Sequence, residues 1–178
     1  FKFLHIPVQS GSDKVLHDMK RGHTVETFRE IVNKAKETFG DFTISTDIIV
    51  GFPSETEEDF QKTVRLLDET RPDVVNLSKY SARPGTDAAE LKQIDVREVK
   101  RRSKIVFEQI NKIAIENNKK WIGWRGNVVF DEKTEDGIKG RNFAYKPVFV
   151  RDQVDIGELH TIEITNVTIN SLVGKIVS

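Results

Sequence analysis

The sequence contains no cysteine, no long apolar run and no excess of either charge. Without cysteine, the chain cannot hold a disulfide framework, a thiolate metal site or a cysteine nucleophile. No apolar run approaches the roughly 18 to 20 residues that a membrane span requires, and the first residues lack the features of a signal peptide. Basic and acidic residues both number 28, so the net charge argues neither for nor against a polyanionic partner. These absences favour a cytosolic protein with no membrane partner.

Apolar runs that are typical of β-strands alternate with helical patterns in the first 80 residues. The strands are expected at residues 3–8, 43–50 and 74–78, and the second is rich in β-branched residues, as parallel strands with two covered faces are. This alternation indicates right-handed parallel β/α units. Three units are too few to close a barrel, so we expect the chain to be a fragment whose missing units precede Phe1.

Capping residues predict where the helices begin and end. Thr24 is expected to cap a helix that ends at Gly40. Ser54 and Glu57 are expected to form a capping box for the next helix. A long helix is then expected over residues 95–118, because its apolar residues recur every three or four positions.

The pattern changes after Lys120, where short β-type runs are separated by turn residues. Such runs predict a small antiparallel barrel. We therefore predict an α/β fold, the last three units of a partial TIM-like barrel, followed by a small all-β barrel. The expected boundaries are residues 1–94 for the partial barrel, 95–119 for a linking basic helix and 120–178 for the β-barrel.

Ligands of parallel β/α barrels bind where the strands end, so the strand ends are the places to search for a site. Gly51 lacks a side chain at such an end, so a flat ligand can approach its backbone closely; alternatively, Gly51 and Pro53 only form a tight turn. Gln9 and Ser10 can hydrogen-bond a ribose or a carboxylate, or they can cap the next helix.

Three further polar side chains near these strands each have two interpretations. Asp47 lies among apolar strand residues, where a carboxylate needs a structural partner or faces a cavity. The planar guanidinium of Arg83 suits a phosphate or carboxylate, or it forms a surface salt bridge. His5 is interpreted as a packed strand histidine, since no second metal ligand lies at metal-binding spacing.

Four motifs, in this order, resemble the radical S-adenosylmethionine methylthiotransferases. They are His5–Ser12 (HIPVQSGS), Met19-Lys20-Arg21, Asp47–Pro53 (DIIVGFP) with Glu55-Thr56, and Arg83–Thr86 (RPGT) with Ala88-Ala89. The family ends in a TRAM domain, a small RNA-binding β-barrel, and the residues after Lys120 resemble one. Ser54 stands where many members have Gly.

The resemblance implies an activity and its cofactors. Family members attach a methylthio group to carbon 2 of a modified adenosine beside the tRNA anticodon, using S-adenosylmethionine and two [4Fe–4S] clusters. The motifs most resemble the archaeal and eukaryotic enzymes that act on threonylcarbamoyladenosine; the enzymes for isopentenyladenosine are the alternative. Both clusters need thiolate ligands, so this chain alone is predicted to be inactive, with no catalytic or metal-binding residue of its own.

The resemblance also assigns residue roles. Six residues lie on the cofactor side: Gln9, Ser10, Asp47, Gly51, Phe52 and Pro53. Of these, the segment from Gly51 to Pro53 would pack on the adenine of S-adenosylmethionine, and Gln9 and Ser10 would lie near its ribose or methionine part. Arg83 would face the substrate.

Local clustering of basic residues predicts an RNA partner, namely tRNA. Residues 95–120 contain eight Lys or Arg residues against four acids. The β-barrel interleaves cations with aromatic residues, a pattern suited to stacking bases while contacting phosphates; the residues are Arg141, Phe143, Tyr145, Lys146 and Arg151. The alternatives are a solvated helix face with a barrel core, or a non-catalytic RNA-binding module. We also expect the strand at residues 3–8 to pair with another chain, because an exposed apolar edge invites self-association.

Overall fold

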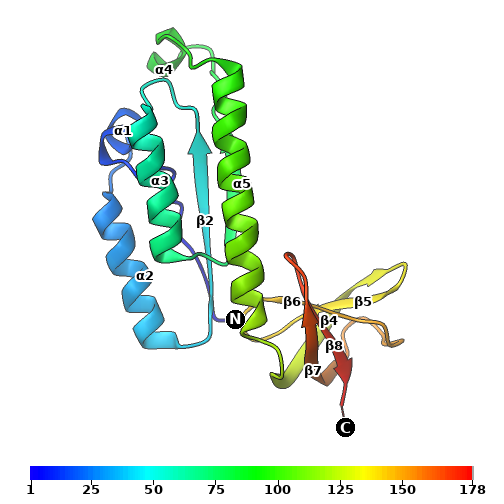
Figure 1. Cartoon of the computed structure of the whole chain (residues 1–178). Coiled ribbons are helices and arrows are strands. Elements are labelled where there is room, and N and C mark those ends of the chain that lie inside the picture. The colour runs from blue at the N-terminus through cyan, green and yellow to red at the C-terminus, as the bar shows by residue number, and fades with distance from the viewer. Residues whose placement is uncertain (178) are drawn as a thin grey trace. The chain divides into compact units, whose positions relative to one another are not determined.

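The computed structural model describes residues 1–177, which form two compact units (Figure 1). Residues 5–40 and 44–110 form one, here called the α/β unit. Residues 1–4, 41–43 and the described residues from 111 onward form the other, here called the barrel unit. None of the described helices is long and apolar enough to cross a membrane.

A three-stranded sheet in the order β1-β2-β3 is the framework of the α/β unit. Its strands are β1 (Phe3–His5), β2 (Thr43–Val50) and β3 (Val74–Lys79), and β2 and β3 are parallel. β1 is shorter than expected because Pro7 has no N–H group and the N–H of Val8 donates to the side chain of Thr46 rather than to the sheet. A parallel bridge between Gln9 and Ile48 resumes the pairing.

The helices of the chain are α1 (Asp13–Asp18), α2 (Val25–Phe39), α3 (Glu57–Thr70), α4 (Asp87–Glu90) and α5 (Val96–Lys119). As predicted, Thr24 caps α2 by accepting a hydrogen bond from the N–H of Thr27, and Gly40 ends it with a φ of 61°. The apolar faces of α1, α2 and α3 are buried, as are alternate β2 residues, so one face of the sheet meets helices. Figure 1 shows α2, α3 and α5 on the viewer's side of β2.

The prediction of a capping box by Ser54 and Glu57 is wrong. Thr56 is the N-cap of α3, and its partner in the capping box is Asp59. The Asp59 carboxylate accepts hydrogen bonds from the N–H of Thr56 at 3.1 Å and from its hydroxyl at 2.7 Å. The Ser54 hydroxyl instead donates to Asp18. The observed capping box begins two residues later than the predicted one, and Glu55 precedes the helix with a fully buried side chain.

Five strands close the predicted small β-barrel in the order β4-β5-β6-β8-β7. They are β4 (Arg125–Thr134), β5 (Gly137–Arg141), β6 (Pro147–Val150), β7 (Leu159–Val167) and β8 (Leu172–Ile176). The barrel is not wholly antiparallel, because β6 and β8 pair in parallel. β5 was not predicted from its glycines and charges; a Cβ at Gly140 would lie 2.3 Å from the Val129 carbonyl oxygen, so the close pairing requires glycine there.

Candidate functional site

A cavity of about 710 Å³, here called the strand-end pocket, lies where β2 and β3 end. Residues from the α1–α2 connection and from the loop before α4 complete it. Its lining comprises Asp18, Met19, Lys20, Arg21, Ile49, Phe52, Ser78, Lys79, Tyr80, Ser81, Arg83, Gly85, Thr86, Asp87 and Ala88. The volume falls within the range of about 300 to 1,000 Å³ that is typical of small-molecule sites.

Phe52 and Tyr80 form the aromatic part of this pocket. Their ring centroids lie 5.2 Å apart in an edge-to-face arrangement, and Phe52 is buried. Pro53, by contrast, does not line the pocket. The aromatic pair and Ile49 give the pocket an apolar surface that suits a flat heterocycle.

Gly51 has a left-handed backbone conformation, with a φ of 83°, which glycine adopts without strain. Its N–H donates to Oε2 of Glu55 at 2.8 Å. A Cβ at Gly51 would lie 2.7 Å from Cγ2 of Val99 on α5, so a protein side chain occupies the space. The expectation that a ligand approaches the Gly51 N–H is therefore corrected: that group is already bonded.

A buried ion pair holds the segment that follows Gly51. Nη1 of Arg102 donates to Glu55 Oε2 at 2.8 Å and to the Glu55 carbonyl oxygen at 2.9 Å, and the two side chains are 6% and 0% exposed. Burial raises the pKa of Glu55, although the bonds from Arg102 and the Gly51 N–H oppose this rise. Arg102 is one of the eight basic residues counted in residues 95–120, and its buried charge is turned toward Glu55 and away from any RNA partner.

Gln9 and Ser10 are both buried. The Ser10 hydroxyl is 0% exposed, accepts a hydrogen bond from the N–H of Ser12 at 3.2 Å and lies 3.5 Å from the Thr63 hydroxyl. Ser10 therefore fastens the turn before α1, and its assignment as a ligand contact is corrected. Gln9 has a φ of 74° and joins β2 through its backbone.

Asp47 lies in a row of polar side chains across the sheet. Its carboxylate accepts a hydrogen bond from Nδ2 of Asn76 at 2.9 Å and lies 3.4 Å from Nε2 of His5. Because β2 residues alternate and Ile48 is fully buried, Asp47 lies on the face opposite the helices. Its partners are the structural ones that the alternative interpretation required, and His5 is a strand histidine.

Arg83 is exposed and lines the strand-end pocket. Its carbonyl oxygen accepts a hydrogen bond from the Thr86 hydroxyl at 2.8 Å, which folds the loop. Among the residues from 1 to 177, no acidic side chain forms an ion pair with its guanidinium. The guanidinium thus remains available to a ligand.

The loop from Asn142 to Lys146 decides which barrel residues can meet RNA. The Asn142 side chain accepts hydrogen bonds from the N–H groups of Ala144 and Lys146, both at 3.0 Å. This tight loop turns Ala144 and Lys146 inward and leaves Phe143 and Tyr145 37% and 41% exposed. Lys146 is 4% exposed and donates through Nζ to Asn118 at 3.0 Å. Its prediction as an RNA contact is corrected.

Arg141, Phe143 and Tyr145 belong to one partly exposed cluster, whereas Arg151 lines a separate cavity of the β-barrel. The Arg141 guanidinium lies 4.8 Å from the centre of the Tyr145 ring. The Phe143 ring centre lies 5.7 Å from that of Trp121, and the Lys2 ammonium lies 5.6 Å from the Phe143 ring. Cations therefore lie over half-exposed aromatic rings, as in a surface that stacks bases.

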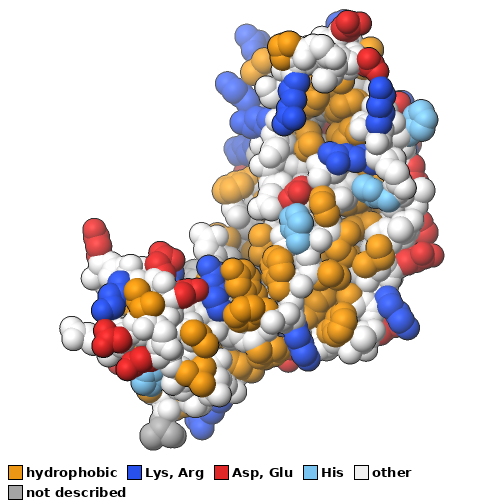
Figure 2. Space-filling view, turned by 180° about the vertical axis from the view of Figure 1, so that it is seen from behind, with side chains coloured by type: hydrophobic (Ala, Val, Ile, Leu, Met, Phe, Trp, Pro, Cys, Tyr) orange, Lys and Arg blue, Asp and Glu red, His pale blue; other side chains and the backbone are white. Residues whose placement is uncertain are grey.

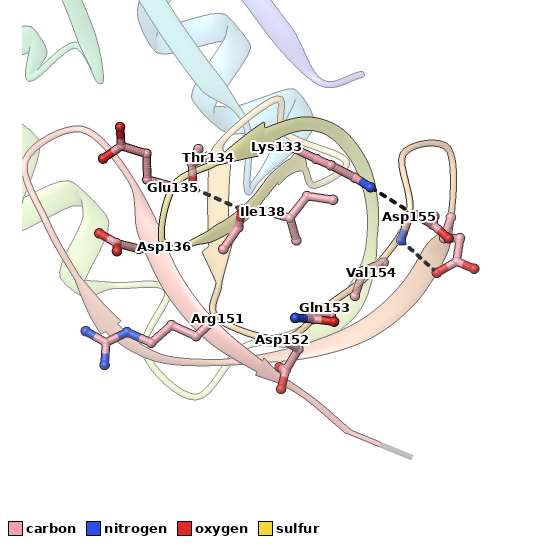
Figure 3. Close-up of a pocket in the computed structure, with 12 residues that line it drawn as sticks. Lys133, Thr134, Glu135, Asp136, Ile138, Arg151, Asp152, Gln153, Val154 and Asp155 are labelled. Atoms are coloured by element: carbon pink, nitrogen blue, oxygen red, sulfur yellow. Dashed lines mark hydrogen bonds and ion pairs between the residues drawn. The ribbon is translucent and has the colours of Figure 1, made fainter.

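A second cavity, of about 670 Å³, lies in the β-barrel between the β4–β5 turn and the β6–β7 connection (Figure 3). Carboxylates outnumber cations in its lining: Glu135, Asp136, Asp152, Asp155 and Glu158, against Lys133 and Arg151. Lys133 is itself paired with Asp155 at 3.0 Å. This excess of negative charge makes the cavity unsuitable for a phosphate backbone.

Comparison with known proteins finds one superfamily and a set of named enzymes that the chain resembles. The radical SAM superfamily matches residues 1–67. A probable threonylcarbamoyladenosine tRNA methylthiotransferase of Archaeoglobus fulgidus is 46% identical over 99% of this chain and 41% of that protein. One of Methanocaldococcus jannaschii is 43% identical over 99% of this chain and 40% of that protein. The resemblance to methylthiotransferases is thereby confirmed.

Two further matches have lower sequence identity to the chain. A tRNA-2-methylthio-N(6)-dimethylallyladenosine synthase of Magnetococcus marinus is 39% identical over 98% of this chain and 41% of that protein. The solved structure of coproporphyrinogen III oxidase (HemN) of Escherichia coli, a radical SAM enzyme, matches 100% of this chain and 46% of the HemN chain. The TM-score is 0.55 and the sequence identity 16%, which supports a TIM-like barrel fold. The chain spans about two fifths of the length of the curated relatives.

The match to the radical SAM superfamily implies S-adenosylmethionine and a [4Fe–4S] cluster as the groups to test. The chain contains no cysteine, and residues 1–177 contain no group of three or more His, Asp or Glu residues that could hold a metal ion. These residues therefore do not fit an iron–sulfur cluster. The strand-end pocket, with Ile49 and Phe52 at its floor and polar side chains around them, does fit an adenosyl group.

Proposed function

We propose that this chain forms part of a tRNA methylthiotransferase that acts on carbon 2 of threonylcarbamoyladenosine beside the anticodon. The observation that carries the proposal is the similarity of nearly the whole chain, at 40 to 46% identity, to five archaeal proteins named for this activity. Such an enzyme would act in the cytoplasm, where tRNA is its substrate.

In this proposal the strand-end pocket receives S-adenosylmethionine and the target base. Phe52 and Ile49 supply an apolar surface for the adenine, and Tyr80 orients the Phe52 ring from the side. Gly51 and the Glu55–Arg102 ion pair hold Phe52 in place. Both proposed [4Fe–4S] clusters would take their thiolate ligands from residues outside these 178.

The β-barrel is proposed to be a TRAM domain that binds the tRNA. Its exposed cluster of Arg141, Phe143 and Tyr145 is the proposed contact surface. The proposed boundaries remain residues 1–94, 95–119 and 120–178. Because α5 runs from Val96 to Lys119 without interruption, it would link the two domains.

Isopentenyladenosine is the alternative substrate. The three bacterial enzymes named for the dimethylallyl nucleoside are 37 to 39% identical to the chain. Their identity is lower than that of the archaeal group, which favours the threonylcarbamoyl nucleoside. A purely RNA-binding module is the second alternative, and it predicts that the strand-end pocket contributes nothing to turnover.

A chimera tests the proposed activity. The matched region of the Archaeoglobus fulgidus relative would be replaced by this chain, whose 46% identity over 99% of its length supports a compatible fold. After anaerobic cluster reconstitution, the chimera should add a methylthio group to tRNA that carries threonylcarbamoyladenosine, as detected by nucleoside mass spectrometry. Activity only on tRNA with isopentenyladenosine would favour the alternative substrate.

The matched control is the same chimera with Phe52→Ala. It should bind tRNA normally but cleave S-adenosylmethionine poorly. Full activity of this control would remove Phe52 from the cofactor site, and activity of neither chimera on either tRNA would contradict the proposed function.

A further inference from the structure

Four basic side chains lie around the strand-end pocket: Lys20, Arg21, Lys79 and Arg83. They come from three separate segments, the α1–α2 connection, the end of β3 and the loop before α4. All four are exposed. Of the four, the sequence assigned a binding role to Arg83 alone, although Lys20 and Arg21 belong to the Met19-Lys20-Arg21 motif.

Most of this positive charge is not compensated. Lys20 is paired with Asp87 at 2.7 Å. This hydrogen bond raises the pKa of Lys20 and lowers the pKa of Asp87. The second carboxylate of the lining, Asp18, accepts a hydrogen bond from Ser54 and lies 3.5 Å from the His17 ring. The remaining three cations, Arg21, Lys79 and Arg83, form no ion pair within residues 1–177.

The floor of the pocket is apolar, in contrast to its rim. Ile49 and Phe52 lie there, with Tyr80 packed edge-to-face on Phe52 at 5.2 Å. Figure 2 shows Lys and Arg side chains around hydrophobic side chains at the end of the molecule that carries α4. An apolar floor within a ring of cations is what a base and its flanking phosphates require.

We propose that Arg21, Lys79 and Arg83, here called the basic rim, bind phosphodiester groups on either side of an RNA nucleotide whose base enters the strand-end pocket. The inference rests on the proposed function and adds the residues that hold the substrate backbone. Arginine binds phosphate through a planar fork and lysine through a point charge, so both types suit the role. Cations on three separate segments match an extended polyanion better than a single small anion.

The inference is tested with the whole chain and a labelled RNA stem-loop that carries an adenosine next to its anticodon. Binding is measured by fluorescence anisotropy at several salt concentrations, because each phosphate contact to a single strand contributes about 0.7 to the slope of log affinity against log salt. Arg21→Ala, Lys79→Ala and Arg83→Ala should each lower the slope by about 0.7, and the triple variant by about 2. Lys substitutions at Arg21 and Arg83 should retain the slope.

Two matched controls separate the basic rim from general charge and from the β-barrel. Arg65→Ala removes an exposed cation on α3 that is remote from the pocket lining and should leave the slope unchanged. Tyr145→Ala should weaken binding without changing the slope, because stacking releases no counterions. Circular dichroism melts establish that each variant is folded.

Three outcomes overturn the inference. One is a wild-type slope in the folded triple variant; another is displacement of the RNA by inorganic phosphate at matched ionic strength, which would indicate a small-anion site. The third is an active chimera in which the triple substitution leaves the KM for tRNA unchanged. This last outcome would contradict the basic rim but not the proposed function. Absence of any RNA binding by the wild-type chain would count against both.

Discussion

The two units of the molecule differ in what they bury. The core of the barrel unit consists of apolar side chains, from Trp121 to Leu172. The α/β unit buries the charged side chains of Glu55, Asp59 and Arg102 beside its apolar core. These charges lie at the segment that shapes the strand-end pocket and form an ion pair and a capping box there. The barrel unit buries the charged side chain of Lys146, which donates to the neutral side chain of Asn118.

The two tryptophans allow the units to be followed separately. Trp121 and Trp124 both belong to the barrel unit, so tryptophan fluorescence reports on that unit. The helical circular dichroism signal reports mainly on the α/β unit, which contains α1 to α4 and most of α5. The predictions below use this separation.

Arg102→Ala should have the largest effect, because it leaves the Glu55 carboxylate buried without its cation. The free energy of unfolding of the α/β unit should fall by about 3 to 5 kcal/mol. Urea denaturation followed by circular dichroism measures it, while the fluorescence transition should stay in place. Arg101→Ala is the control: because its pairs with Glu57 and Glu98 are exposed to solvent, the loss of stability should be far smaller. Equal losses of stability in Arg102→Ala and Arg101→Ala would contradict the claim that burial makes the Arg102 ion pair important.

Gly51→Ala should destabilise the α/β unit for two separable reasons. A left-handed φ costs a residue with a Cβ about 1 to 2 kcal/mol, and the new methyl group also collides with Val99. In a Val99→Ala background only the first cost should remain. Denaturation of the two single variants and the double variant measures the difference, and identical costs in both backgrounds would show that Val99 does not confine Gly51.

Lys146→Met should lower the stability of the barrel unit and leave tRNA affinity nearly unchanged. The substitution keeps the buried stem but removes the Nζ bond to Asn118, and an unsatisfied buried acceptor costs about 1 to 3 kcal/mol. The fluorescence transition measures the loss. Arg141→Met, on the exposed cluster, should show the reverse: stable folding with weaker tRNA binding. A stable Lys146→Met variant that binds tRNA poorly would restore Lys146 as an RNA contact.

Asp59→Asn should change how the α/β unit responds to acid. Although burial raises its pKa, hydrogen bonds from Ser12 and Thr56 lower the pKa of Asp59 well below its usual value. A depressed native pKa stabilises the fold above the unfolded pKa of about 3.9, and this stability is lost as the pH falls through the native value. The variant should lose about 1 kcal/mol of capping stability at neutral pH and decline less steeply below pH ~4. Acid titrations of both proteins, followed by circular dichroism, measure the decline. An equally steep decline in Asp59→Asn would contradict the prediction.

Ser54→Gly should have the smallest effect. Ser54 contacts the exposed Asp18 rather than capping α3, and substitutions of this kind usually change stability by less than about 0.5 kcal/mol. The Ser54 hydrogen bond lowers the pKa of Asp18, so the substitution should raise it toward its ordinary value, as measured by NMR titration. A large loss of stability would assign Ser54 to the capping of α3 after all.

Local patterns in the sequence determined the elements and the resemblance to the methylthiotransferases. The β-branched run Thr43–Val50 is a strand with those same ends, and Thr24 and Gly40 bound α2, because β-propensity and caps act through neighbouring residues. The methylthiotransferase motifs are likewise contiguous stretches. The same local reasoning failed for Ser54, because two capping registers two residues apart both satisfied the pattern.

Only the tertiary structure decided which side chains act together. Glu55 and Arg102 are 47 positions apart, and Lys146 turns inward because Asn142 folds its loop. Arg21, Lys79 and Arg83 meet at one pocket because parallel strands bring their ends to the same edge. A linear pattern records which face of its own element a residue occupies, but burial and charge pairing depend on the neighbours that packing brings from elsewhere in the chain.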